Sequence, residues 1–523
     1  MIALLERING GQAVYLKYKE AFMDKTQALS IYNDTNKKLR VFRLMNFLSG
    51  WDAETEAPDG AIIYRGETLG TGSSMYYELA NSEEYKEAID VLYASRDELD
   101  DVLKHEIEVM KKSSEKLAKI PREEYIEHTK LMNEAYPMYV NAKNASDFAA
   151  FKPYLEKIVA FSRNYLIWQD TPKMHGYNIL LDEYEDDMTE EEYDNFFNLL
   201  KEKLVPFIAK VVSNEEKLNE KLTSGHFSRE KQIEFCKYIR RVMCFDERYT
   251  VIKESEHPFT SSFGNKDVRV TNHYYEDNLA SSIFSAIHEM GHGLYELQVS
   301  DDVDKTLSGG GASMAMHESQ SRFMENMIGR SEAFWSVHFG KLKEIFAEEL
   351  DGVTLSDFMK YINHVERSLI RTEADELTYP MHIIVRYEIE KELMAGRISV
   401  EDLPKVWNAK YKEYLGLDVP SDKEGVLQDV HWADGNFGYF PTYALGSAYA
   451  AQIYHAMSKD IDIEGSLSKG DVSVIAAWLK EHLHKYGSSK KPKELLKIAT
   501  GEDFNPNYYV DYLIGKYSKL YNV

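Results

Sequence analysis

The sequence predicts a mainly helical protein that forms one large domain with a small β element. Apolar residues recur every three or four positions over most of the chain, and proline is sparse, at 13 of 523 residues. Alternation with a period of two is concentrated in one stretch, residues 249–275, which we expect to form the β element. No linker rich in proline, glycine or serine and no repeat of fixed period divides the chain.

The composition is that of a folded protein, and it excludes some classes of function. Apolar residues make up 44% and charged residues 28% of the sequence, which is ordinary for a globular protein. Its 62 basic and 87 acidic residues give a formal net charge of −25, and no stretch carries a long run of Lys and Arg. We therefore expect no nucleic-acid partner, because such binding needs a concentrated basic face.

The two cysteines and the lengths of the apolar runs indicate the cellular compartment of the protein. Cys236 and Cys244 lie in a predicted helix, residues 230–245, where eight positions separate them by about 12 Å. That is too far for a disulfide, so we expect two reduced core thiols. Glu6 and Arg7 interrupt the short apolar run at the start, which is unlike a signal peptide, and no run is long enough for a membrane span. We expect a cytoplasmic protein with no membrane partner.

The N-terminal helical part covers about residues 1–245. Helical periodicity runs from residue 12 to about 130, broken by a predicted turn at residues 49–60, and continues over residues 141–222. We interpret Trp51–Pro58 (WDAETEAP) as a packed turn, with a functional contact as the alternative. Thr189 with Glu192 forms a predicted capping box that opens one helix, and Ser228 opens another.

The predicted β element comes directly before the most informative helix. Val268 and Val270 alternate with polar residues. An edge strand beside a metal-binding helix can bind the backbone of a peptide by strand addition, and we consider that role here as a hypothesis. His257, Asp267 and Arg269 either line a cleft or tie the strands together.

The stretch Ser282–Leu297 (SIFSAIHEMGHGLYEL) predicts a metal site on a helix. His288 and His292, four positions apart, lie on one face with roughly 6 Å between their Cβ atoms, so both imidazoles can reach one ion. Glu289 is then placed to act as general base toward a water that the metal activates. The alternative is a buried pair of histidines with a structural role. An apolar stripe supports a buried helix and consists of Ile283, Ile287, Met290, Leu294 and Leu297.

Two glycines in this helix predict a close neighbour. Gly291 and Gly293 each lower helix propensity by about 1 kcal/mol relative to alanine. We expect another helix to approach the backbone there.

A third metal ligand is predicted on the next helix, over about residues 313–328. Glu318 follows His292 by 26 residues, and two histidines with one carboxylate leave a position for water on zinc. Gln320, Ser321 and Arg322 are expected neighbours. We expect one divalent metal per chain, zinc first, with cobalt or manganese as alternatives because the same ligands accept them.

Six motifs resemble those of the carboxypeptidase Taq family of metallocarboxypeptidases. They are HPF at 257–259, DVRVT at 267–271, HEMGH at 288–292, HESQSR at 317–322, IRTEAD at 370–375 and GVLQDVHW at 425–432. The resemblance implies a mainly helical fold with a deep substrate groove, a homodimer, zinc or cobalt, and release of single residues from peptide C-termini. It matches His288, His292 and Glu318 to the ligands and Glu289 to the general base.

The metal-site part, about residues 246–455, also holds candidates for substrate binding. Arginine binds carboxylates through two parallel hydrogen bonds, and Arg371 is the first candidate for the substrate's C-terminus, with an ion pair to Asp375 as the alternative. Asp375 and Asp429 are candidate acceptors for the free N–H of a ligand histidine. His431, Tyr439 and Tyr443 are expected in the cleft wall, as oxyanion donors or as packed aromatics. Residues from about 456 to 523 are expected to be closing helices.

The sequence thus predicts a metallocarboxypeptidase that acts on peptides with a free C-terminus. A metallo-oligopeptidase or an aminopeptidase could use the same two histidines and glutamate, but an aminopeptidase needs acidic groups for the substrate's ammonium. A non-catalytic peptide-binding protein is a third hypothesis, and it predicts the loss of a ligand or of the base.

Overall fold

The computed structural model describes residues 23–58, 60–214 and 217–523. The N-terminal stretch expected not to be a signal peptide lies outside these residues. The chain divides into two compact units, residues 1–115 and 116–523. The expectation of a single domain stays a prediction.

The first unit is helical throughout its described part. Its elements are α1 (Lys25–Thr55), α2 (Ala61–Ala80), α3 (Glu83–Ala94), a 3₁₀ turn (Arg96–Glu98) and α4 (Asp101–Ala118), which runs into the second unit. α1 packs on α3, and the Tyr32 hydroxyl of α1 donates to buried Glu106 of α4. The predicted turn at residues 49–60 begins later than expected, because α1 continues to Thr55 and buries Trp51.

The second unit is also built mainly of helices. They are α5 (Arg122–Ala145), α6 (Phe148–Gln169), α7 (Asn178–Leu181), α8 (Glu190–Val212), α9 (Glu220–Thr223), α10 (Arg229–Val242), α11 (Leu279–Gln298), α12 (Asp301–Asp304), α13 (Met314–Arg322), the π-helix η3 (Phe323–Gly329), α14 (Glu332–Ile345), α15 (Leu355–Ile362), α16 (Tyr379–Met394), α17 (Leu403–Leu415), α18 (Pro441–Asp460), α19 (Ile463–Leu467), α20 (Ser473–His482), α21 (Pro492–Thr500) and α22 (Asn507–Tyr521). Short 3₁₀ turns lie at Arg371–Glu373, Val400–Asp402 and His484–Tyr486. The capping box of Thr189 begins α8 as predicted.

A three-stranded sheet lies beside α11, where the sequence predicted the β element. Its strands are β1 (Thr250–Glu254), β2 (Thr260–Ser262) and β3 (Val268–Asn272), in the order β1-β3-β2. β1 is parallel to β3, and β2 pairs antiparallel with β3 so that Ser261 is opposite Arg269. β2 is therefore an edge strand, and it contacts α11.

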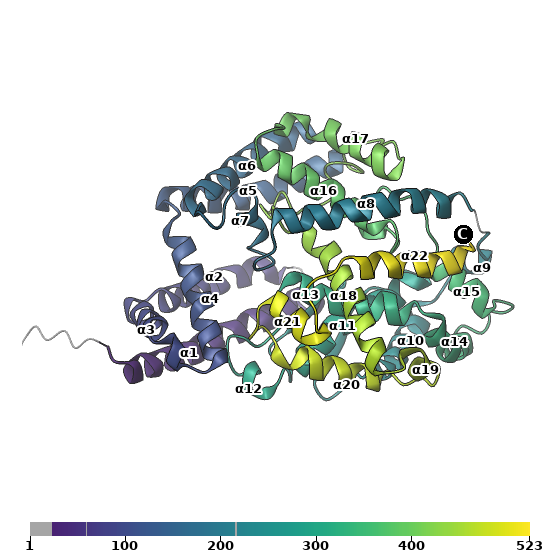
Figure 1. The fold of residues 1–523 in the computed structure, drawn as a ribbon, viewed down its shortest axis with the longest axis horizontal. Helices are drawn as coiled ribbons and strands as arrows, with labels where there is room; N and C mark the ends of the chain where they lie inside the picture. The colour runs from purple at the N-terminus through teal and green to yellow at the C-terminus, as the bar shows by residue number, and fades with distance from the viewer. Residues whose placement is uncertain (1–22, 59, 215–216) are drawn as a thin grey trace, which may run out of the picture. The chain divides into compact units, whose positions relative to one another are not determined.

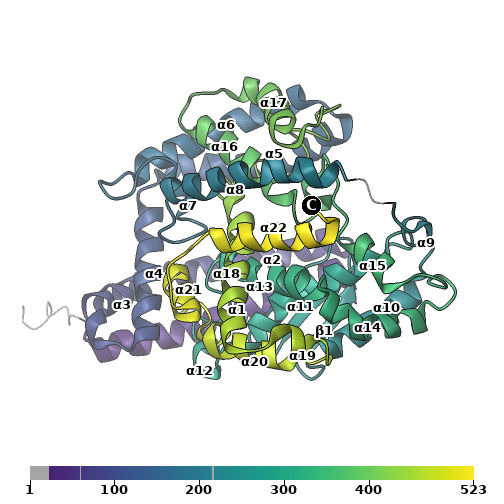
Figure 2. The ribbon, with the colours of Figure 1, turned by 45° about the vertical axis from the view of Figure 1, so that its right-hand side comes forward.

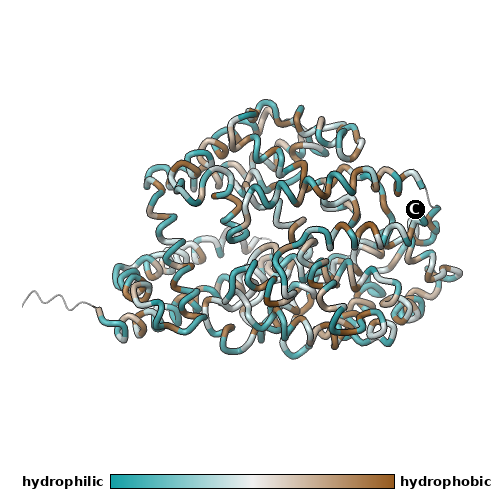
Figure 3. Tube along the Cα trace, viewed as in Figure 1, coloured by the Kyte–Doolittle hydropathy of each residue, from teal (hydrophilic) through white to brown (hydrophobic). Residues whose placement is uncertain are grey.

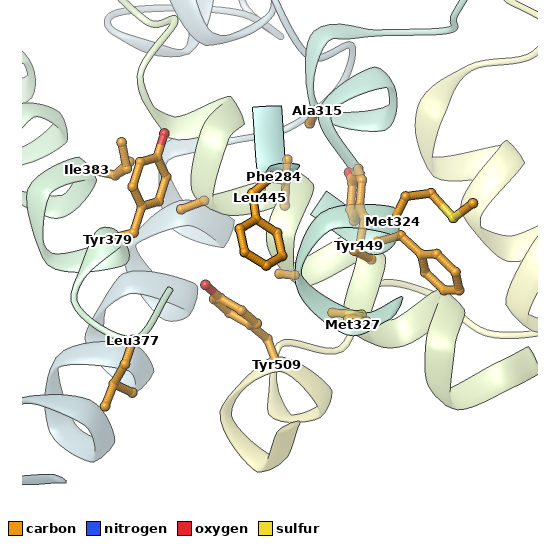
Figure 4. Close-up of a cluster of buried hydrophobic side chains, with 14 of the residues drawn as sticks. Phe284, Ala315, Met324, Met327, Leu377, Tyr379, Ile383, Leu445, Tyr449 and Tyr509 are labelled. Carbon is orange, nitrogen blue, oxygen red and sulfur yellow. The ribbon is translucent and has the colours of Figure 1, made fainter. Parts of the chain in front are cut away.

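α11, α13 and α18 form the centre of this second unit (Figure 1). α8 and α22 run side by side in Figure 1 and again in Figure 2. Figure 4 shows part of the core, with Phe284 of α11, Leu445 of α18 and Tyr509 of α22 in one buried cluster. The mainly helical fold with a small β element beside the HExxH helix is confirmed.

Apolar residues alternate with polar ones along the helices of the described chain (Figure 3). None of the helices in this part combines the length and the apolar character that a membrane span requires. Both cysteines are free, as predicted, but only Cys236 is a core thiol. Cys244 is exposed because α10 ends at Val242, and the next residues leave the helix.

Candidate metal centre and active site

α11 carries His288, Glu289 and His292. The helix is fixed by a cap at its N-terminus and by its buried apolar stripe. Its first turn is capped by Asn278, whose side chain accepts from the N–H of Ser281. Ile283 and Leu294 are buried at 3% and 2% exposure, so the helix is fixed against the core along its length. This anchoring leaves the stripe of the two histidines at the edge of the core.

Gly291 is the point where α13 comes against α11. A Cβ atom added there would lie 2.7 Å from Ser321 Cα and 2.8 Å from the carbonyl oxygen of Gln320. The expected neighbouring helix is therefore α13. Gly293 serves a different contact, because its Cβ would meet the ring of Phe245 at 2.5 Å and Val268 of β3.

The crossing of α11 and α13 brings together three groups that can hold a metal. His288 Nε2 lies 3.8 Å and His292 Nε2 lies 3.5 Å from Glu318 Oε2. One ligand atom from each residue lies within 4.8 Å of the others. Two imidazole nitrogens and one carboxylate oxygen are a donor set typical of catalytic zinc sites, so the residues present fit a divalent metal.

Arg322 orients Glu318, the third candidate ligand. Its Nε donates to Glu318 Oε1 at 2.7 Å, and Nη1 lies 3.4 Å from Glu325 Oε2. Glu318 therefore has one oxygen engaged by arginine and the other directed at the histidines. Burial favours the neutral carboxyl, but Arg322 and the two histidines outweigh it and hold the pKa of Glu318 well below its usual range.

The two histidines differ in their outer partners. His288 Nδ1 lies 2.9 Å from Glu325 Oε2, and His292 Nδ1 lies 2.6 Å from His317 Nδ1. Burial lowers the pKa of both rings, yet the hydrogen bond to Glu325 and the charge of Glu318 raise the pKa of His288 overall. The pKa of His292 stays lowered, mainly by burial.

Neither aspartate expected at the ligand histidines lies there. Asp375 lies instead in the turn before α16, where it accepts from the backbone N–H groups of Leu377 and Thr378, and burial raises its pKa to about 6. Asp429 accepts from Arg371 and Arg386. Glu325 and His317 take the two places because they lie on the segment that packs directly on α11.

Arg371 is buried, with its side chain 8% exposed, and its ion-pair partner is Asp429, at 2.9 Å, rather than Asp375. Its Nη1 donates to the Tyr379 hydroxyl at 3.2 Å. The ring of Tyr379 lies under the guanidinium of Arg322, 4.6 Å from its centre. Tyr379 thus joins Arg371 to the arginine that holds Glu318.

An aromatic cluster lies beside Arg371. The guanidinium is 4.9 Å from the centre of the Tyr443 ring, and the Tyr443 hydroxyl is 3.1 Å from His431 Nε2. Tyr439 packs edge-on against Tyr443, with ring centres 5.2 Å apart. Burial lowers the pKa of His431 to about 4, so its ring is neutral at physiological pH. His431, Tyr439 and Tyr443 therefore pack together in one aromatic cluster, and their place in a cleft wall stays a prediction.

The two candidates in the β element have hydrogen-bond partners within that element. His257, in the connection from β1 to β2, has an exposed side chain, and its carbonyl accepts from Ser255. Arg269 on β3 makes a bidentate pair with Asp267, at 2.7 and 2.8 Å. This pair favours the role of tying the strand over that of lining a cleft.

Sequence reasoning missed several residues that support the site. They are Thr260, Ser262, Glu296, His317, Glu325, Tyr379 and Arg386. Glu296 follows His292 by one turn, and that spacing was an available signal. Glu325 follows Glu318 by seven residues through a π-helix, which the sequence pattern did not reveal.

A mainly helical fold in which the HExxH helix α11 meets a glutamate on α13 is that of a metallopeptidase. The chain belongs to the carboxypeptidase Taq (M32) metallopeptidase family, whose model matches residues 32–517. Carboxypeptidase 1 of Bacillus subtilis is 40% identical to it over 505 residues, 96% of this chain and 99% of that protein. Thermostable carboxypeptidase 1 of Pyrococcus furiosus is 35% identical, over 90% of this chain and 94% of that protein.

Solved structures agree with this assignment. The M32 carboxypeptidase of Deinococcus radiodurans R1 superposes on this chain with a TM-score of 0.91 at 34% sequence identity. The match covers 95% of this chain and 100% of that structure. The protein is a metal-dependent carboxypeptidase that acts on peptides. The alternatives of an oligopeptidase, an aminopeptidase and a non-catalytic binding protein are not favoured.

Proposed function

We propose that His288, His292 and Glu318 hold one divalent metal, with Glu289 as the general base of peptide hydrolysis. The observation that carries the proposal is the convergence of the three ligand groups, whose donor atoms lie within 4.8 Å of one another. Glu289 follows the first ligand directly, and its Oε2 accepts from the Thr260 hydroxyl at 2.5 Å. That contact holds the carboxylate on the side of β2.

The reaction is divided between the metal and the chain's own groups. When bound, a divalent metal supplies Lewis acidity that polarises the scissile carbonyl and acidifies a water. Glu289 takes a proton from that water and delivers it to the leaving amine. A hydroxyl of Tyr439 or Tyr443, or His431, donates to the developing oxyanion, since all three lie in one aromatic cluster beside Arg371.

Arg371 binds the free C-terminal carboxylate of the substrate. A guanidinium has five N–H donors, and the contacts with Asp429 and Tyr379 use three of them, so two donors remain. Asp429 also accepts from Arg386, so two cations share one anion and this cluster of three residues keeps a positive charge. An anionic substrate is therefore attracted in a chain whose formal net charge is −25.

Several finer assignments belong to the same proposal. Zinc is the first choice of metal, with cobalt or manganese accepted by the same ligands. The edge strand β2 pairs with the substrate backbone beside a deep groove. The resemblance to the family supports a homodimer, which light scattering of the eluted protein tests. Two cysteines in 523 residues, both free, support a cytoplasmic location.

The experiment is mass spectrometry of an N-terminally blocked peptide with a free C-terminus, beside its C-terminally amidated twin and a chelator control. The expected product is a ladder shortened one residue at a time, absent from the twin and from the chelated sample. Glu289→Gln should abolish the ladder while the protein still binds metal. Full activity of Glu289→Gln, or cleavage of the amidated twin, would overturn the assigned roles.

A further inference from the structure

A chain of hydrogen bonds leads away from His292 on the side opposite Glu318. His292 Nδ1 lies 2.6 Å from His317 Nδ1, and His317 Nε2 lies 2.8 Å from Glu296 Oε1. The other oxygen of Glu296 accepts from the Ser262 hydroxyl at 2.8 Å. The N–H of Gly311 adds a further donor to Glu296 Oε1 at 3.2 Å. The chain thus connects α11, α13, the glycine turn and β2.

The proton positions in this chain follow from the direction of His292. Its Nε2 is the nitrogen that faces Glu318 Oε2, so a metal held at Nε2 requires the lone pair there and the proton of His292 on Nδ1. Nδ1 then donates to His317 Nδ1, which leaves the proton of His317 on Nε2 to be donated to Glu296. With the proton of His292 on Nδ1, a neutral His317 and an ionised Glu296 give each of the two contacts one donor and one acceptor.

Packing fixes the middle of the chain. The ring of His317 lies between those of His292 and Tyr295, with centres 4.6 and 5.5 Å away. A Cβ atom at Gly311 would lie 2.3 Å from His317 Cδ2, so only glycine lets the turn approach this ring. The side chain of Glu296 is 9% exposed, which makes an unpaired carboxylate there costly.

His288 provides an internal comparison. Its Nδ1 reaches the carboxylate of Glu325 directly, whereas His292 reaches the carboxylate of Glu296 through one interposed imidazole. The hydrogen bonds that begin at Nδ1 of each histidine therefore lead to a buried carboxylate. His317 is the element that makes the second pairing possible, because His292 has no carboxylate within direct reach of its Nδ1 in the described structure.

We propose that His317 is a positioning residue which, with Glu296, sets the tautomer and orientation of His292 for metal binding and ties them to β2 through Ser262. The proposal rests on His292 being a metal ligand. It adds a role for His317 beyond that of a neighbour of Glu318. The loss of an outer partner of this kind costs about 10- to 100-fold in metal affinity.

The test measures the dissociation constant of zinc by competition with a chromogenic chelator, for the full-length chain and its variants. We expect His317→Ala to raise the constant by about 10- to 100-fold. His317→Asn should lose less, because its amide oxygen can accept from His292 Nδ1. Ser262→Ala should have the smallest effect, since it leaves Glu296 its other donors. The matched control is His338→Gln, which alters a buried histidine paired with Tyr238 and far from α11 in sequence.

Two further readouts separate positioning from folding and from ligation. The visible spectrum of the cobalt-loaded protein should change in His317→Ala and stay unchanged in His338→Gln, while the metal-free melting temperatures of both variants shift alike. His288→Ala must lose metal binding if the ligand assignment is right, and unchanged binding would overturn that assignment. If His288→Ala loses binding while His317→Ala binds zinc as tightly as the wild type, the ligands stand and the role of His317 is refuted.

Discussion

Thr260 Oγ1 lies 2.5 Å from Glu289 Oε2 and 3.0 Å from the carbonyl oxygen of Glu289. The hydroxyl has one proton, so the charged carboxylate takes it and the carbonyl contact restrains the threonine rotamer. The proposed general base is thus held by a residue of β2, outside the helix that carries it.

Thr260→Val should lower kcat with little change in KM. The substitution keeps the shape of the side chain and removes the donor, and hydrogen bonds to charged groups contribute about 1.5–3 kcal/mol, which corresponds to roughly 10- to 100-fold. Steady-state kinetics on a blocked peptide with a free C-terminus measure this. Thr260→Ser keeps the hydroxyl and should retain most of the rate, and a Val variant with wild-type kcat would contradict the role.

Gly291→Ala and Gly340→Ala should change stability in opposite directions. At Gly340 of α14, nothing lies within 4 Å of an added Cβ, so alanine should stabilise the helix by up to about 1 kcal/mol. At Gly291 the methyl group would meet Ser321 Cα at 2.7 Å, and overpacking costs about 1–3 kcal/mol. Urea unfolding of the metal-free variants measures both. A stabilised Gly291→Ala would contradict the tight crossing of α11 and α13.

Arg371→Met should lower kcat/KM for peptides with a free C-terminus. Removing one partner of a buried charge pair costs about 2–5 kcal/mol, which corresponds to a loss of roughly 30-fold or more. Arg371→Lys should not restore the rate, because an ammonium cannot form two parallel hydrogen bonds. Arg397→Met, which breaks an exposed pair with Glu392, is the control. Equal rates for Arg371→Met and the control would remove Arg371 from substrate binding.

Glu185→Gln should flatten the dependence of stability on pH. Glu185 is fully buried where it accepts from the Tyr449 hydroxyl, and burial raises its pKa to about 7. The folded protein keeps this proton up to about pH 7, whereas the unfolded chain loses it near the ordinary value of 4.5, so stability falls as pH rises between the two. The variant should lack a slope of up to about 1.4 kcal/mol per pH unit.

Urea unfolding in the presence of chelator, at several pH values from 4.5 to 7.5, provides that slope for Glu185→Gln. Chelator keeps metal binding out of the comparison. Glu191→Gln on the exposed face of α8 is the matched control, since its carboxyl lies in water in the folded and the unfolded chain. Identical slopes in Glu185→Gln and the wild type would mean that the buried carboxyl does not hold the extra proton.

Removal of metal should lower the melting temperature by an amount that grows with the logarithm of the metal concentration before removal. A ligand at about 100 times its dissociation constant stabilises the folded state by about 2.7 kcal/mol. Thermal unfolding with zinc and with chelator measures this increment. His288→Ala should melt at the same temperature in both conditions, and a zinc-dependent shift in that variant would point to a different site.

The sequence predicted the parts of the site that depend on local spacing. His288 and His292 share a face because four residues make about one turn, Glu289 directly follows the first of them, and Glu318 was inferred from the type of ligand that such a pair needs. The neighbour expected at Gly291 is α13. These inferences needed only the helix period and the cost of glycine in a helix.

Contacts made through tertiary packing could not be predicted from the sequence pattern. Glu325 reaches His288 because the helix widens to a π-helix at Phe323–Gly329, and Lys516 of α22 donates to the carbonyl of Asn326 there. Asp429 was expected beside a histidine, but Arg386, fifteen residues after Arg371, joins Arg371 in binding it. Nothing in local periodicity distinguishes those partners.

The edge strand β2 carries both Thr260 and Ser262 on the side facing α11, with Ser261 opposite Arg269 between them. Because side chains alternate along a strand, a slip of one residue would turn both hydroxyls away from the helix at once. A single insertion or deletion between Phe259 and Thr260 would therefore disable the support of the general base and that of a metal ligand together. An insertion or deletion of two residues, or one beyond Phe263, would keep Thr260 and Ser262 facing α11. The register of this three-residue strand therefore fixes both contacts that support the catalytic centre.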